Sequence, residues 1–322
     1  MVRFFRKHFI VSLVFSPLLL NAYAQDPAPQ DSPLPTLTVS VKIVALDAVV
    51  HDRDGKLVLN LDKDAFTLKV DGKPTDIRYF NRDNDLPLTI GLMVDTSGSQ
   101  RTYFEEEKRS CETFLTKVLT NQGDRAMVVR FDTRVLLLQK MTASLPDLRN
   151  ALRLLDYRDP DIGTSQGGTL LFDAISSVSK SVASKEVGRR AVIILTDGDD
   201  NGSVALKDDA IRQAQLADVA VYSVLYTHEV FGGIRYPTAG SRPSGVLVME
   251  QISKATGGQA FIVGTGTPIA EIFAKIERDL RSQYRFGFTP LPSKPGKYHR
   301  LDLRTGEKHQ AIQTRAGYYS PN

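Results

Sequence analysis

The middle of the chain, where short apolar runs alternate with amphipathic segments, constrains the fold most strongly. Residues 88–94 form a nearly continuous apolar run, which is typical of a strand buried on both faces of a sheet. The segments between such runs repeat apolar residues every three or four positions, which is the spacing of one helix face. This alternation continues to residue 280 and predicts a parallel sheet covered by helices on both faces, with right-handed crossovers.

The expected elements of this region follow one another in order. Strands at 126–131 and 135–138 are joined by a short turn at Asp132-Thr133. The other expected strands are 191–195, 219–225 and 260–263, and the expected helices are 104–118, 170–182, 205–216, 246–255 and 269–280. Cys111 lies on the apolar stripe of its helix and is expected in the core.

Both flanks of this region show the two-residue period of β-strands instead. The strands expected on the flanks are 37–50, 66–70, 77–80, 284–288, 301–303 and 311–314. A slip of phase after Val44 predicts a bulge in the first of them. Each flank is too short to bury a core alone. We therefore expect an α/β domain with a doubly wound, mostly parallel sheet at 86–282, inserted into a β-sandwich made from 36–85 and 283–319, with a short tail at 320–322.

The first 24 residues have the three parts of a secretory signal peptide. Basic residues precede an apolar run at 9–20, and Ala22-Tyr23-Ala24 follows it, so cleavage is expected after Ala24. The run is shorter than the roughly 20 residues that span a bilayer, and Pro17 interrupts it. Residues 25–35 are rich in Pro, Asp and Gln and are expected to form a flexible linker. We expect an exported protein, periplasmic or extracellular, with no membrane span in its mature form.

Composition excludes several classes of function. The 322 residues include one Cys, which rules out an intramolecular disulfide framework and a multi-Cys zinc site. The formal net charge is +4, but the expected signal peptide holds three basic residues and no acidic one, so the mature chain carries +1. That balance gives no argument for nucleic-acid binding, and no nucleic-acid-binding motif is present.

Three boundaries between elements carry small oxygen-bearing side chains. They are Asp95-Thr96-Ser97-Gly98-Ser99 after the first buried strand, Gly167-Gly168-Thr169 before the helix at 170, and Thr196-Asp197-Gly198 after the strand at 191–195. Ligands of an open parallel sheet bind beyond the carboxyl ends of its strands. Two carboxylates and three hydroxyls without sulfur or imidazole suit Mg²⁺, with Mn²⁺ or Ca²⁺ as alternatives. The two carboxylates formally balance the charge of the ion. If both bind it through water, the ion stays electrophilic on its exposed side and favours an anionic ligand, most simply an Asp or Glu of a protein partner.

This set of residues resembles the metal-ion-dependent adhesion site of von Willebrand factor type A domains. The resemblance covers about residues 86–281. It implies that Ser97 and Ser99 bind the ion directly, Thr169 directly or through water, and Asp95 and Asp197 largely through water. The flanks, among them 62–66 and 315–319, look like the secreted bacterial "VWFA-related" group. Family resemblance also implies that movement of the last helix, at 269–280, couples to the metal face.

Other residues near these motifs have less definite roles. Gly98 and Gly168 are expected beside the metal. Asp173 lies four residues after Thr169 on the same helix face, where it either orders that hydroxyl or offsets the helix dipole. The Gly/Pro/Ser-rich loop that contains Thr227, Arg235 and Arg242 is expected to select the partner, with a surface loop without a task as the alternative. Residues 197–202 also fit the opening of an EF-hand loop, with Asp208 in place of the Glu, but a strand precedes them.

The function predicted from these observations is an exported, non-enzymatic adhesion module that recognises an acidic side chain through Mg²⁺. One alternative is a structural or assembly scaffold in the cell envelope. Another is a metal-dependent hydrolase, although such enzymes normally use more carboxylate or His ligands. A Ser/His/Asp hydrolase stays open, although no Ser lies in a G-x-S-x-G elbow. The identity of the partner and the oligomeric state do not follow from the sequence.

Overall fold

A six-stranded sheet forms the centre of the α/β region. The computed structural model describes residues 43–82, 86–100, 103–155, 168–183, 188–226, 243–264 and 266–321, all within one compact unit. The strands are ordered β10-β9-β8-β5-β6-β7, and every neighbouring pair is parallel except β6 and β7. Their bounds are β5 (Leu88–Asp95), β6 (Arg125–Phe131), β7 (Val135–Thr142), β8 (Arg189–Thr196), β9 (Ala220–Leu225) and β10 (Ala260–Ile262). The predicted mostly parallel sheet is confirmed.

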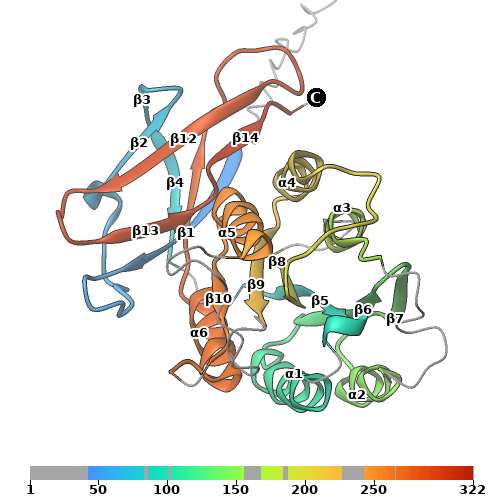
Figure 1. Ribbon diagram of the computed structural model, residues 1–322. Helices are drawn as coiled ribbons and strands as arrows, with labels where there is room; N and C mark the ends of the chain where they lie inside the picture. The colour runs from blue at the N-terminus through green and yellow to red at the C-terminus, as the bar shows by residue number, and fades with distance from the viewer. Residues whose placement is uncertain are drawn as a thin grey trace, which may run out of the picture. The chain divides into compact units, whose positions relative to one another are not determined.

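Helices cover both faces of this sheet (Figure 1). On one face lie α1 (Phe104–Val118), α2 (Leu145–Arg153) and α6 (Ile269–Arg281). On the other lie α3 (Leu171–Ala183), α4 (Lys207–Leu216) and α5 (Ser244–Thr256). The two helix layers bury two separate apolar clusters, because successive residues of each strand point to opposite faces. The sheet is therefore doubly wound, as its sequence pattern predicts.

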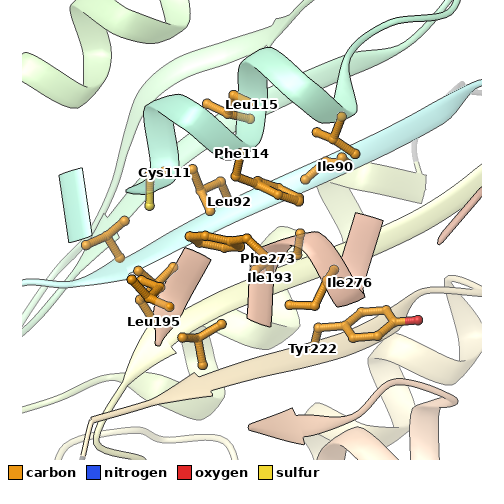
Figure 2. Packing of buried hydrophobic residues seen from close by; sticks show 14 of the residues in the cluster. Ile90, Leu92, Cys111, Phe114, Leu115, Ile193, Leu195, Tyr222, Phe273 and Ile276 are labelled. Carbon is orange, nitrogen blue, oxygen red and sulfur yellow. The ribbon is translucent and has the colours of Figure 1, made fainter. Parts of the chain in front are cut away.

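The cluster under α1 and α6 is dominated by two stacked rings (Figure 2). Phe114 of α1 and Phe273 of α6 have ring centroids 4.6 Å apart, and Leu92 of β5 lies in the same cluster. Cys111 is fully buried in it, as expected from its position on the helix stripe. These contacts hold both helices on the central strands, whose carboxyl ends carry the candidate site.

The flanking strands form two four-stranded antiparallel sheets. Their orders are β13-β1-β11-β4 and β14-β12-β2-β3. Their bounds are β1 (Val44–His51), β2 (Phe66–Val70), β3 (Lys73–Thr75), β4 (Ile77–Asn81), β11 (Tyr284–Phe288), β12 (Tyr298–Thr305), β13 (Ala311–Thr314) and β14 (Gly317–Tyr319). Side chains from both sheets, including Leu46, Phe66, Phe286 and Leu303, share one core. Strands from the two ends of the chain thus complete a common sandwich, in agreement with the predicted insertion.

Buried arginines join the α/β region to the sandwich strands. Arg189 at the start of β8 is 1% exposed, and its guanidinium donates to the carbonyl oxygens of Leu280 (3.1 Å) and Gln283 (2.9 Å). Arg315, just after β13, donates to the carboxylate of Asp218 at 2.8 Å. A guanidinium has several donors in a fixed plane, so it can satisfy carbonyl groups of separate segments at once. The end of α6 is therefore anchored to the sheet at the point where the sandwich resumes.

Some elements were missed or wrongly predicted from the sequence. Helix α2 has no counterpart among the expected helices, although Ser144 accepts the N–H of Asp147 at 3.4 Å as an N-cap and Pro146 lies in the first turn. The short strands β3 and β14 were also missed. The bulge predicted after Val44 was wrong, because β1 pairs with β11 without a shift of register from Val44 to Ala48.

The predicted signal peptide and linker, residues 1–24 and 25–35, lie outside the described residues, as does the strand predicted before residue 43. Within the ranges that are described, no helix combines the length and the apolar character needed to cross a membrane.

Replacing Phe273 by Ala tests the stacked pair of the core. Loss of a buried ring is expected to lower the free energy of unfolding by about 3–5 kcal/mol. The control is Leu216→Ala, since Leu216 is 51% exposed and should change stability by less than about 1 kcal/mol. Urea denaturation followed by circular dichroism measures both. Equal effects of the two substitutions would contradict the packing described here.

Candidate metal centre

Asp95, the last residue of β5, lies at the centre of the candidate site. Its side chain is fully buried. One carboxylate oxygen accepts the backbone N–H of Ser97 at 2.9 Å. The other accepts the hydroxyl of Thr196, at the end of the adjacent strand β8, at 2.6 Å. Asp95 is therefore held in one orientation by the two loops that follow neighbouring strands, at the carboxyl edge where the sequence predicts a ligand.

The surroundings of Asp95 are unfavourable for an unpaired negative charge. Burial raises the pKa of Asp95 to about 7, although the hydrogen bonds from Ser97 and Thr196 act to lower this pKa. The charge of Asp197 acts in the same direction as burial. A nearby cation stabilises an ionised carboxylate, so this position fits a divalent cation on electrostatic grounds.

The loop after Asp95 places the two candidate serine ligands next to each other. The hydroxyl oxygens of Ser97 and Ser99 are 3.0 Å apart, and both side chains are half-buried. The 3₁₀ turn η2 (Gly98–Gln100) produces this arrangement. Gly98 is exposed, and a Cβ added there would meet no atom within 4 Å. No contact among the described residues therefore requires glycine at position 98.

Thr169 and the loop after Asp197 are joined by a reciprocal pair of hydrogen bonds. The N–H of Thr169 donates to the side-chain oxygen of Asn201 at 2.5 Å, and the N–H of Asn201 donates to the carbonyl of Thr169 at 3.3 Å. Thr169 is 5% exposed. Beside it, Gly168 has only ordinary contact distances around an added Cβ, the nearest atom being a methyl carbon of Thr133 at 3.4 Å. Two of the three predicted loops are therefore directly connected.

Asp132, just after β6, connects the remaining pair of loops and was missed as a site residue. It is 2% exposed. Its carboxylate accepts the hydroxyl of Thr96 at 2.9 Å, and its carbonyl accepts the N–H of Leu170 at 2.8 Å. The sequence interpretation assigned Asp132 only to a turn. An Asp directly after a buried strand at this edge is the same signal that identified Asp95 and Asp197, and it would have found Asp132.

Asp173 lies in the first turn of α3, where one of its two expected roles, offsetting the helix dipole, stays a prediction. Its carboxylate oxygens accept the backbone N–H groups of Val204 (3.0 Å) and Ala205 (2.9 Å). Asp173 therefore fastens the loop after Asp197 to the first turn of α3. Ser203 of that loop in turn accepts the N–H groups of Phe172 and Asp173 at 3.1 and 3.2 Å. The loop and the helix start thus satisfy each other's backbone groups.

The turn after Asp197 requires glycine for two reasons. Gly198 has a φ of +87°, which L side chains rarely adopt. A Cβ there would also lie 2.5 Å from the carbonyl oxygen of Gly245, in the first turn of α5. The side chain of Asp197 accepts the N–H of Asp199 at 3.1 Å. The EF-hand alternative for this loop is excluded because strand β8, and not a helix, precedes it.

The donor set fits a hard divalent cation. Among the described residues no group of three or more His, Cys, Asp or Glu side chains is placed to hold an ion. The predicted set has only two carboxylates, Asp95 and Asp197, and its other donors are the hydroxyls of Ser97, Ser99 and Thr169. Oxygen donors with few carboxylates are typical of Mg²⁺ sites that keep bound water. The candidate partner-selecting residues Thr227, Arg235 and Arg242 lie outside the described residues.

A Ser/His/Asp arrangement is present in the sandwich, far along the chain from the metal loops. His299 bonds Asp71 through Nδ1 at 2.8 Å, and through Nε2 it contacts Ser293 at 2.9 Å and Ser320 at 3.0 Å. His299 is 1% exposed and stacks on the ring of Tyr318. The Asp, the His and the two Ser satisfy one another's hydrogen bonds. This network is sufficiently explained as a structural connection between the ends of the sandwich strands.

Comparison with known families finds one match, which lies within the α/β region. Residues 90–199 match the family model of the von Willebrand factor type A domain. The matched segment includes the three predicted metal loops. It covers about a third of the chain, and the sandwich strands lie outside it. No curated protein matches the chain.

Several solved structures are similar to parts of this chain at low sequence identity. BatB from Bacteroides thetaiotaomicron is 18% identical, with 61% of this chain and 100% of that chain covered and a TM-score of 0.45. A von Willebrand factor type A protein from Catenulispora acidiphila is 11% identical, with coverage of 87% and 74% and a TM-score of 0.47. Proximal thread matrix protein 1 from the mussel byssus, with zinc in its MIDAS motif, is 13% identical, with coverage of 61% and 48% and a TM-score of 0.45.

The raised pKa of Asp95 predicts how the stability of the metal-free protein depends on pH. From about pH 4 to about pH 7 the folded state holds a proton at Asp95 that the unfolded state has lost, so the free energy of unfolding falls as the pH rises, by on the order of 4 kcal/mol. Asp95→Asn should remove this part of the fall. Urea denaturation in EDTA across this range measures it, and equal slopes for both proteins would contradict it.

Proposed function

We propose that this chain, whose residues 90–199 carry a von Willebrand factor type A domain, is an exported, non-enzymatic protein that binds an acidic side chain of a partner through Mg²⁺. The observation that carries the proposal is the buried carboxylate of Asp95, bonded both to the Ser97 loop and to Thr196 beside Asp197. Of these residues, the resemblance assigns Asp95, Ser97 and Asp197 to the metal.

The five proposed metal-site residues differ in how they contact the ion, directly or through water. Ser97 and Ser99, whose hydroxyls are 3.0 Å apart, are proposed to bind the ion directly. Thr169 binds directly or through water, and Asp95 and Asp197 act largely through water. The ion supplies an electrophilic position for an anionic ligand, while the chain orients its own hydroxyls and carboxylates around that position. Mn²⁺ and Ca²⁺ are the alternatives to Mg²⁺.

The charge of the site supports an acidic partner. The two carboxylates of Asp95 and Asp197 formally balance the charge of a divalent cation. The five site residues and the ion together therefore carry no net negative charge that would repel an Asp or Glu of a partner. An ion that keeps exchangeable water accepts an oxygen from outside more readily than one enclosed by protein carboxylates. The loop with Thr227, Arg235 and Arg242 is proposed to contribute to the choice of partner.

Export and domain boundaries are part of the same proposal. A signal peptide at 1–24 places the mature chain in the periplasm or outside the cell. The proposed arrangement is a linker at 25–35, sandwich segments at 36–85 and 283–319, and the inserted domain at 86–282. No nucleic acid is among the proposed partners.

A structural or assembly scaffold in the cell envelope is the second candidate. The hydrogen bonds of Asp132, Asp173 and Asn201 join all three metal loops, so an ion bound there would also stabilise the fold. A hydrolytic role is the third, and sustained Mg²⁺-dependent turnover on a panel of phosphoesters, lost in Asp95→Ala, would favour it over binding.

Asp95→Ala tests the proposed metal site directly. The wild type is expected to bind Mg²⁺ in isothermal titration calorimetry, and the variant to lose at least about tenfold in affinity, because a carboxylate that orients metal-bound water is removed. Asp147→Ala is the matched control, since Asp147 is an exposed Asp on α2. Its affinity should equal that of the wild type.

The partner is sought by pull-down from the native envelope, with and without EDTA. The adhesion proposal expects one protein to be retained by the wild type with Mg²⁺ and lost with EDTA or with Asp197→Ala, at an unchanged melting temperature in EDTA. Retention by the variant, together with a large loss of thermal stability on metal removal, would favour the scaffold.

A further inference from the structure

Three polar side chains buried next to the candidate metal centre have no hydrogen-bond partner within the described part of the chain. Both carboxylate oxygens of Glu107, both amide atoms of Gln100 and the hydroxyl of Tyr226 have no partner among the described residues. Each of these residues is 1% exposed. A buried polar group that lacks a hydrogen bond costs free energy. Three such groups near the same edge of the sheet call for a common explanation.

These side chains come from segments that surround the carboxyl ends of β5 and β9. Gln100 ends the 3₁₀ turn that carries Ser99, and Glu107 lies in the first turn of α1. Tyr226 follows β9, and its N–H donates to the carbonyl of Thr196 at 3.1 Å. The ring of Tyr226 stacks on Tyr103, at the start of α1, with centroids 4.7 Å apart. A short chain of contacts thus leads from Thr196, which bonds Asp95, to the helix turn that carries Glu107.

The electrostatics place Glu107 within the influence of the metal ligands. Burial raises the pKa of Glu107 well above its ordinary value, and the charges of Asp95 and Asp197 raise it further. Glu107 in turn raises the pKa of Tyr226, after burial as the main cause. Three carboxyl groups therefore lie close enough to repel one another, two of them fully buried, and only a cation or protonation relieves that repulsion.

We propose that Glu107, supported by Gln100 and Tyr226, is a positioning residue for the metal ion, whose carboxylate accepts hydrogen bonds from ion-bound water on the inner side of the site. The proposal rests on the proposed function, since it requires a divalent cation at Asp95. Glu107 is not proposed as a ligand, because it belongs to no group of acidic side chains among the described residues that is placed to hold an ion. Such outer partners orient the ligands and tune the affinity of a metal site.

The proposal gives Glu107→Gln two effects of opposite sign. Removing one negative charge and one acceptor for bound water should raise the dissociation constant for Mg²⁺ by about tenfold. The same change removes a buried acid without a partner, so the melting temperature in EDTA should rise or stay equal. A purely structural role in packing would instead lower the melting temperature in EDTA and leave the dissociation constant unchanged.

The experiment compares Glu107→Gln with Glu106→Gln, which removes the same charge from the neighbouring exposed residue of α1. Isothermal titration with MgCl₂ and thermal melts in EDTA are run on the full mature chain. Glu106→Gln should change the dissociation constant by less than about twofold, since exposed charges are screened. A third variant, Tyr226→Phe, removes only a hydroxyl and should weaken Mg²⁺ binding by a smaller factor than Glu107→Gln.

The outcomes separate this proposal from the one on which it rests. If the wild type binds Mg²⁺ and Asp95→Ala does not, but Glu107→Gln binds as the wild type does, the role of Glu107 is refuted and the metal site stands. Equal weakening by Glu106→Gln and Glu107→Gln also refutes it, because the effect would then be one of net charge. If the wild type itself binds no Mg²⁺, both proposals fail.

Discussion

The hydrogen bond between Asp95 and Thr196 joins the two central strands of the sheet at the edge where the candidate site lies. The carboxylate of Asp95 is fully buried, yet it is placed where a second carboxyl group, that of Asp197, opposes its ionisation. A folded chain tolerates such an arrangement when the buried charge is compensated. The Thr196 hydroxyl and the Ser97 N–H compensate it in part. The incomplete compensation is the physical reason to look for a cation at this edge, independent of any family resemblance.

The loops around Asp95 are held by side chains that are not themselves candidate ligands. Asp132 holds the loop of Thr96 against the residue before α3, and Asn201 and Asp173 hold the loop after Asp197 against the same helix start. Each of these carboxyl or amide groups accepts backbone or hydroxyl hydrogens, so the frame is complete without an ion. The fold therefore sets the positions of the donor atoms before an ion binds. Ion binding then costs little free energy for ordering the chain. Preorganisation of this kind favours both affinity and selectivity.

The sequence predicted correctly those features that depend only on the local pattern of apolar and polar residues. The run at 88–94 predicted a strand buried on both faces, and Cys111 was placed correctly on the inner stripe of α1. Asp95 and Asp197 were predicted as site residues because they directly follow buried strands. Asp132 also directly follows a buried strand, so the same signal would have marked its position. Its hydrogen-bond partners and those of Asp173 could not be predicted, since they depend on which distant loop the fold brings to each residue. Glu107 was missed for a further reason. An acid in the first turn of a helix has an ordinary explanation in the helix dipole, and only its burial, with no hydrogen-bond partner among the described residues, sets Glu107 apart.

The anchoring of α6 constrains how the candidate site can communicate with the sandwich. Only two residues separate α6 from β11. The guanidinium of Arg189, buried at the start of β8, donates to carbonyl oxygens at both sides of this junction, and His51 of β1 contacts the buried Asp279 at 3.1 Å. A movement of α6, as the family resemblance implies for a switch, that separated Arg189 from the carbonyl oxygens of Leu280 and Gln283 would break two buried hydrogen bonds, which costs free energy. Because Arg189 belongs to β8, keeping these hydrogen bonds holds the end of α6 on the central sheet.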